Sequence, residues 1–218
     1  KSAGCSRIPL LGNFLDTFLN PSVERAFERF LDEAEPDLVH FQHVMLHSYR
    51  LLAVAKKRGL PVLLTLHDYW FICANSQLIW SDAQVCLGKA LGLNCARCVL
   101  AARVKGPLIQ ALRPIAAPLL QIRDALVRRA ALTADLLIAP SHFLIQKYIE
   151  AGFPADRFVY LENGIDVDRI RTYSRKPSPD GRVRFTYLGS LAWQKGVHVL
   201  VEAFRGIPPE DAVLKIYG

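Results

Sequence analysis

The sequence has 218 residues, enough for one large domain or about one and a half ordinary domains. Hydrophobic residues make up 51% of it and charged residues 22%, so the composition excludes a disordered chain and predicts a substantial core. No apolar run approaches the roughly 18 residues that a membrane-spanning helix needs, and the net charge of +7 is unevenly distributed along the chain.

Strand and helix patterns alternate along most of the chain, which predicts an α/β protein with parallel sheets and helices on both faces. Asn20 can cap a helix that begins at Pro21, and Pro36 ends the helical repeat of apolar residues. The next predicted elements are a strand at 37–41, a helix at 48–58 closed by Gly59, and a strand at 62–66.

From Trp70 to about Val99 the alternation breaks, and this loop-rich insertion (about 70–100) contains four of the five cysteines. Residues 101–131 then show a helical pattern that three prolines interrupt, so we expect this helix to kink or divide. The prolines are Pro107, Pro114 and Pro118.

The segment 101–131 is also basic, with six cationic residues against one acid, Asp124, which gives a net charge of +5. Both a solvated helical face and contact with an anionic membrane surface are compatible with such a stretch. Nucleic acid binding is disfavoured, because no nucleic-acid-binding motif accompanies the charge. The cationic residues are Arg103, Lys105, Arg113, Arg123, Arg128 and Arg129.

Regular alternation resumes after residue 131, with a strand at 135–139, a helix that Ser141 caps and that runs to Glu150, and a strand at 158–161. Residues 171–182 contain prolines, a glycine, serines and charges without apolar periodicity, which is typical of a linker. A strand at 183–188, a helix at 197–204 and a strand at 212–217 follow. We therefore expect a first domain at 1–168, a linker at 169–182 and a second domain at 183–218. Because both ends look cut, we expect a fragment of a longer protein.

Three short segments place polar residues and glycines where predicted strands end. Ligands of open α/β sheets bind outside the carboxyl ends of the strands, so these segments are candidate sites. In the last of them a strand ends at Gly189 and Lys195 precedes a helix, whose N-terminal amides and nearby lysine suit a phosphate. The same turn also occurs without any ligand. The segments are Thr65–Trp70 (TLHDYW), Glu162–Asp166 (ENGID) and Leu188–Gly196 (LGSLAWQKG).

In this order and spacing, the three segments resemble glycosyltransferases of the GT-B fold, and specifically family 4, over residues 36–218. The resemblance implies two Rossmann-like, doubly wound parallel-sheet domains. The first would bind the acceptor, and residues 183–218 would be the start of a truncated nucleotide-sugar domain. It also implies transfer of a sugar from a nucleotide diphosphate donor to an acceptor hydroxyl, with retention at the anomeric carbon and no cofactor required for catalysis.

The resemblance assigns the donor side of the site to four residues. His67 is the catalytic candidate, because a histidine at this place in the family faces the donor sugar and helps to position it. Gly189, Ser190 and Lys195 are the candidates for binding the donor diphosphate. The family often carries arginine directly after this glycine, where the present sequence has Ser190, so the phosphate contact depends on Gly189 and Lys195.

The resemblance assigns His43, Asp68 and Asn163 to the acceptor side or the cleft. Simpler interpretations remain open: Asp68 can cap the loop that follows it, and Asn163-Gly164 can form a structural turn with positive φ. A metal site at the spacing H-x2-H-x3-H of His40, His43 and His47 is disfavoured, because the three residues fall on changing structure.

The resemblance implies a nucleotide-sugar donor and a glycan, lipid-linked or small-molecule acceptor. It also implies a cytoplasmic role in polysaccharide, glycolipid or envelope glycan synthesis. The basic segment 101–131 adds peripheral contact at the inner membrane face, and no nucleic acid partner is expected. Two alternatives within the fold are a non-catalytic, degenerate GT-B domain that binds glycan or a partner protein, and a sugar-nucleotide epimerase or phosphorylase.

Four cysteines of the insertion have the spacing C-x12-C-x8-C-x2-C. Four thiolates can hold a structural zinc ion and fix a segment with little core of its own. Only one C-x2-C pair is present, so reduced buried thiols and disulfides remain alternatives. The residues are Cys73, Cys86, Cys95 and Cys98.

Overall fold

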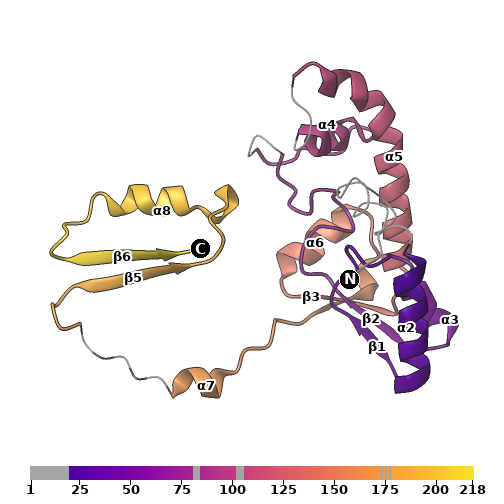
Figure 1. Ribbon diagram of the computed structural model, residues 1–218, viewed down its shortest axis with the longest axis horizontal. Coiled ribbons are helices and arrows are strands. Elements are labelled where there is room, and N and C mark those ends of the chain that lie inside the picture. The colour runs from indigo at the N-terminus through magenta and orange to yellow at the C-terminus, as the bar shows by residue number, and fades with distance from the viewer. Residues whose placement is uncertain (1–19, 81–83, 102–105, 173, 175, 177) are drawn as a thin grey trace. The chain divides into compact units, whose positions relative to one another are not determined.

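The computed structural model describes residues 20–80, 84–101, 106–172, 174, 176 and 178–218 (Figure 1). The chain divides into two compact units, with the boundary between Asn163 and Gly164. The expected linker, 169–182, therefore belongs with the second unit. We describe unit 1 (1–163) and unit 2 (164–218) separately.

Unit 1 is built on a parallel sheet that has, within the described residues, four strands in the order β1-β2-β3-β4. Val39 pairs with Val62, Leu63 with Leu136, and Leu137 with Phe158. Because all neighbours are parallel, the carboxyl ends of the strands meet at one edge of the sheet. The strands are β1 (Val39–Phe41), β2 (Val62–Thr65), β3 (Leu136–Ala139) and β4 (Phe158–Tyr160).

Side-chain caps begin two helices of unit 1 where the sequence predicts them. The Asn20 side chain accepts a hydrogen bond from the Val23 amide at the start of α2 (Pro21–Ala34). Ser141 accepts one from Leu144 at the start of α6 (His142–Glu150). The further helical elements between the strands are α3 (Leu51–Lys57) and a 3-10 turn at Ala155–Arg157.

The insertion after β2 contains turns, an isolated antiparallel bridge between Ile79 and Val85, and α4 (Leu93–Ala101). α4 packs against α5 (Leu108–Ala131), as Figure 1 shows. The helical prediction for this region is confirmed from residue 108 onward, but α5 is not divided at Pro114 or Pro118. Both prolines are exposed. Water can therefore bind the carbonyl groups that lose an intrahelical partner there.

The core of unit 1 lies between the sheet and its helices. Its buried members come from β1, β2 and β3 and from α3, α5 and α6, so the core fixes the sheet against these three helices. Fully buried examples are Leu52, Leu64, Val127, Leu137 and Tyr148. A smaller cluster of Ala96, Ala117 and Leu120 joins α4 to α5.

Unit 2 contains a parallel pair, with β5 (Val183–Leu188) beside β6 (Ala212–Tyr217). α8 (Val197–Phe204) connects them, and these three elements begin and end where the sequence predicts. The short α7 (Val167–Arg171) precedes them, capped by the Asp166 side chain. The turn predicted at Asn163-Gly164 is absent: neither residue has positive φ, and the chain leaves β4 as irregular backbone.

Two successive units, each with a parallel sheet and connecting helices, confirm the predicted α/β fold class. In the described part of the chain, no helix combines the length and the apolarity that crossing a bilayer requires.

Candidate functional site

Polar side chains from the ends of β1 and β2 form a network at the carboxyl edge of the sheet of unit 1. Gln42 lies at its centre. Its amide oxygen is 2.8 Å from Nε2 of His67, and its amide nitrogen is 3.2 Å from Nε2 of His40. The same His40 nitrogen is 2.7 Å from Oγ1 of Thr65. Residues that follow two neighbouring strands are thus held together across the edge.

His67 is exposed at the end of β2, as its sequence position predicts. Since an amide oxygen can only accept, the contact with Gln42 assigns the ring proton to Nε2. The other ring nitrogen, Nδ1, has no hydrogen-bond partner among the residues that the structure describes. It can therefore accept a proton or a hydrogen bond from a bound molecule.

His43 occupies a different environment, although it is close in sequence. Its Nδ1 accepts a hydrogen bond from the amide of Met45 at 2.9 Å, so the ring proton lies on Nε2. That nitrogen is buried without a hydrogen-bond partner in the described residues, and Oδ2 of Asp68 is 3.5 Å away. His43 is therefore arranged to orient the carboxylate rather than to accept a proton from substrate.

Asp68 caps the loop that follows β2, because its Oδ1 accepts a hydrogen bond of 2.7 Å from the Trp70 amide. Burial opposes ionisation of this carboxyl. The contact with His43, the Trp70 amide and the nearby His67 nevertheless hold the pKa of Asp68 below its ordinary value. Asp68 is thus a carboxylate that orders the edge of the site.

Two buried side chains from distant elements hold this loop in place. The hydroxyl of Tyr148, on α6, donates to the backbone carbonyl of Asp68 at 2.8 Å. Arg123, on α5, donates to the carbonyl of Trp70 at 2.6 Å and lies over its ring at 4.8 Å. Sequence analysis did not assign Gln42, Tyr148 or the buried role of Arg123. Of these three residues, only Gln42 carries a signal in the sequence, because it directly follows the strand predicted at 37–41.

Three arginines of the basic segment make hydrogen bonds or ion pairs within unit 1. Arg123 is 4% exposed and pairs with Asp124 at 2.8 Å. Arg128 donates to the carbonyl of Gly152, and Arg113 to the carbonyl of Leu93. Arg103 and Lys105 lie outside the described residues. Much of the predicted surface charge therefore stabilises the fold.

The ends of β3 and β4 add aromatic surface to the same edge. The ring of His142 stacks on Tyr160 with 4.2 Å between centroids, and the Tyr160 hydroxyl donates to Glu162. Asn163 follows as the last residue of unit 1 and is exposed. No contact of its side chain with His43 or His67 is present, and Lys195, Ser190 and Gly189 belong to unit 2.

The glycine loop of unit 2 connects β5 to α8. Gly189 has φ of 150°, a value that side chains rarely adopt, and an added Cβ would lie 3.2 Å from the Tyr187 hydroxyl. That hydroxyl donates to the Ser190 carbonyl at 2.8 Å and so fixes the loop. A 3-10 turn, Trp193–Lys195, then leads to Gly196, which precedes α8 with φ of 69°.

The exposed ammonium of Lys195 and the first amides of α8 belong to the same turn. The first amides of a helix have no intrahelical partner and carry partial positive charge, so this turn can bind an anion.

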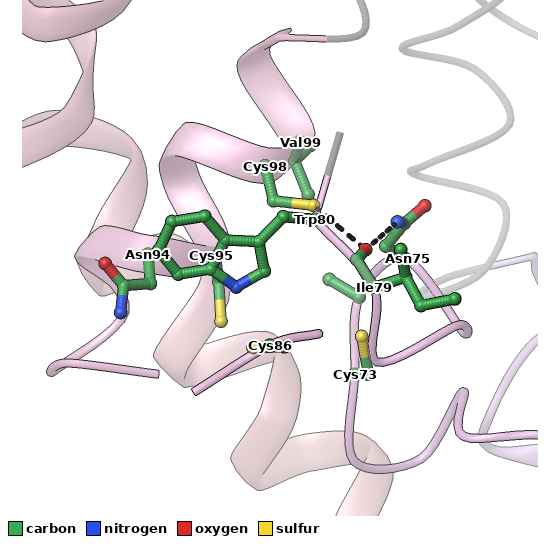
Figure 2. A pocket seen from close by; sticks show the side chains of 10 residues that line it. Cys73, Asn75, Ile79, Trp80, Cys86, Asn94, Cys95, Cys98 and Val99 are labelled. Carbon is green, nitrogen blue, oxygen red and sulfur yellow. Dashed lines mark hydrogen bonds between the residues drawn. The ribbon is translucent and has the colours of Figure 1, made fainter. Parts of the chain in front are cut away.

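The four cysteines of the insertion line one cavity beside α4 (Figure 2). Burial, with help from Asp124, raises the pKa of the Cys95 thiol to about 11.

His40, His43 and His47 do not converge, since the first contacts Thr65, the second faces Asp68 and the third is exposed.

Comparisons with known proteins identify a family. Residues 6–169 match the model of Glycosyltransferase Family 4. No curated protein matches the chain. Among solved structures, the chain is similar to the crystal structure of Anabaena HepE in complex with UDP, with 18% identity and a TM-score of 0.49. The similarity covers 96% of this chain and 46% of that one, so the chain spans about half the length of that protein.

Proposed function

Because the chain belongs to glycosyltransferase family 4, we propose that it transfers a sugar from a nucleotide diphosphate donor to an acceptor hydroxyl, with retention at the anomeric carbon. The family match over residues 6–169 carries this proposal. The ordered polar network at the carboxyl edge of unit 1 supports it, because ligands of open α/β sheets bind at that edge.

The glycine loop of unit 2 binds the donor diphosphate. The leaving diphosphate gains negative charge in the transition state. Fixed donors aimed at that charge, the Lys195 ammonium and the amides that follow Gly189, stabilise it. Ser190 replaces the arginine that the family often has, so Lys195 supplies the full positive charge of this loop. The reaction requires no cofactor.

His67 orients the donor sugar through its unpartnered Nδ1, and Gln42 sets the orientation of its ring. His43 and Asp68 shape the acceptor side, and Asn163 belongs to the same edge of unit 1. In this assignment the histidine that binds substrate is the exposed one, while His43 acts through the carboxylate that it faces.

The acceptor is a glycan, a lipid-linked sugar or a small molecule of polysaccharide, glycolipid or envelope glycan synthesis, in the cytoplasm.

Peripheral contact with an anionic membrane through 101–131 is part of the proposal. The exposed side chains of Ile115, Leu119 and Ile122 on α5, with the exposed Arg129, support it. Sedimentation with anionic vesicles tests this contact. Replacing Ile115 and Leu119 with aspartate should abolish it, and a chain that never sediments with these vesicles would contradict it.

Ligand-dependent stability tests the donor site directly. The melting temperature of the complete native protein is measured with UDP, GDP, ADP and their common sugar conjugates. A nucleotide at a hundred times its dissociation constant stabilises the folded state by about 2.7 kcal/mol. One nucleotide that stands out identifies the donor class, and no response to any of them favours a non-catalytic GT-B domain.

Substitution of the loop lysine tests the mechanism. We expect turnover only in the complete enzyme, because residues 183–218 are the start of the donor domain. There Lys195→Ala should lower turnover at least about tenfold, because one well-placed donor to developing charge is worth roughly 3 kcal/mol. Lys176→Ala, a lysine that precedes β5 and lies outside the loop, is the matched control. Unchanged turnover in Lys195→Ala would remove the lysine from the mechanism.

A further inference from the structure

The four cysteines of the insertion come from separate segments and meet around one cavity. Cys95 and Cys98 are three residues apart on α4 and therefore share a face of the helix. Cys73 lies in the turns after β2, and Cys86 directly follows the bridge residue Val85. Figure 2 shows the helix and the facing loop segments that carry these side chains.

The first residues of the insertion, 70–72, are buried in the core of unit 1, but the rest of the insertion has little hydrophobic core to hold it. The buried cluster between α4 and α5 consists of Ala96, Ala117 and Leu120. Two leucines of the insertion face solvent: Leu87 is 91% exposed and Leu91 is 82% exposed. A small segment with so few buried apolar groups normally needs a disulfide or a metal ion to be stable.

An unpartnered donor lines the same cavity. The indole Nε1 of Trp80 is buried and has no hydrogen-bond partner in the described residues. Leaving a buried N–H unpaired is costly. A neutral thiol is a weak acceptor, whereas a thiolate is a strong one, so the indole N–H suits an ionised cysteine nearby.

One feature of the fold offsets thiolate charge at this cavity, although burial and Asp124 act in the opposite direction on Cys95. Cys95 lies in the first turn of α4, where the helix dipole stabilises negative charge. A tetrathiolate zinc centre carries a net negative charge, which the dipole of α4 partly offsets.

We propose that Cys73, Cys86, Cys95 and Cys98 bind one Zn²⁺ ion tetrahedrally and that this ion holds the insertion together. Each thiol releases its proton to solvent on binding, and no redox step is involved. The indole N–H of Trp80 then donates to a zinc-bound sulfur, as outer groups of thiolate sites do.

Binding requires the four sulfur atoms to come closer together. No group of three or more Cys, His, Asp or Glu side chains in the described residues has metal-binding geometry as it stands. Each cysteine has a single side-chain torsion, and Cys73 and Cys86 lie in loop segments. Rotation about χ1 and closure of the Cys73 and Cys86 segments onto α4 can bring the thiolates together.

Metal analysis of the full chain, purified without chelator, is the first test. We expect about one zinc per chain. Cobalt added to chelated protein should give the intense visible bands of a tetrahedral tetrathiolate site. Less than about a tenth of an equivalent of zinc, with no such bands on cobalt addition, would overturn the proposal. Thiol titration in denaturant adds a second criterion, since disulfides between these cysteines would also overturn it.

Two variants test the assignment of ligands. Cys95→Ser should lose zinc, whereas Cys5→Ser, a change at the fifth cysteine, should retain it. Trp80→Phe keeps the aromatic ring and removes only the N–H, so it should weaken zinc binding in a chelator competition by about tenfold or more. Zinc retained by Cys95→Ser would exclude that ligand set. None of these measurements depends on glycosyl transfer.

Discussion

Gln42 determines the orientation of His67, because its amide oxygen is 2.8 Å from the ring nitrogen that carries the proton. We expect Gln42→Ala to lower kcat/KM by roughly tenfold to a hundredfold, since small errors in the position of a substrate-binding group have effects of this size. The melting temperature should change little, because Gln42 is exposed. Steady-state kinetics and thermal unfolding of the full chain measure both.

His47→Ala is the control for this experiment, because His47 is exposed and lies outside the network. Equal activity of Gln42→Ala and the unmodified chain would show that His67 does not need this orientation.

Asp68 makes stability depend on acid pH. Its pKa is below the ordinary value of 3.8, so the unfolded chain binds the proton more tightly than the folded one. The stabilisation is complete well above the ordinary value and is lost as the pH falls through the lowered pKa. We expect the free energy of unfolding to fall more steeply below about pH 4 in the unmodified chain than in Asp68→Asn.

Urea unfolding at a series of pH values measures this difference, with Asp37→Asn, an exposed aspartate of unit 1, as the control. Identical pH profiles for Asp68→Asn and the unmodified chain would contradict the interpretation.

At the residue scale, the sequence predicts which positions end a strand but not which side chains meet there. The placement of His67 and Asp68 follows from the strand pattern before them. Their contacts with Gln42 and Tyr148 depend on pairing between β1 and β2 and on the packing of α6, which no local pattern encodes.

At the scale of elements, α5 connects the insertion to the sheet through Arg123. We expect Arg123→Ala to destabilise unit 1 by about 3 kcal/mol, because it removes the donor to the Trp70 carbonyl and the packing on the indole, and it leaves Asp124 with only the half-exposed Lys89. Arg129→Ala, at an exposed position of the same helix, should change stability by less than about 0.5 kcal/mol. Urea unfolding compares them, and equal losses would refute the buried role.

Helix caps, prolines and turns show where local sequence patterns predict the helices correctly and where they do not. Asn20 and Ser141 begin helices as predicted, because capping is a contact within one turn. Pro114 and Pro118 were expected to kink or divide the helix, and α5 is not divided there. Both prolines lie on its exposed side, and packing against α4 decides which side faces solvent. The prediction of a turn at Asn163-Gly164 was wrong. The backbone there continues from β4 to the helix that Asp166 caps, and the two residues alone do not show this.

At the scale of the whole molecule, the domain boundary predicted from composition differs from the boundary between the two compact units of the structure. The linker prediction, 169–182, came from composition. The structure separates the units at residues 163 and 164, and α7 (Val167–Arg171) overlaps the start of the region that was expected to be linker. Composition cannot show which unit a five-residue helix accompanies, because its side chains are exposed and add no apolar pattern.

The exposed stretch at this boundary predicts where a protease cuts first. Residues 161–172 are all exposed, and the five-residue α7 is too short to be stable by itself. Trypsin should therefore cleave after Arg169 or Arg171 before it cleaves at Arg128, which lies within α5 and donates to the Gly152 carbonyl. Mass spectrometry of brief digests identifies the first products. Early cleavage within α5 would show that unit 1 opens before the boundary does, which would contradict the division into two compact units.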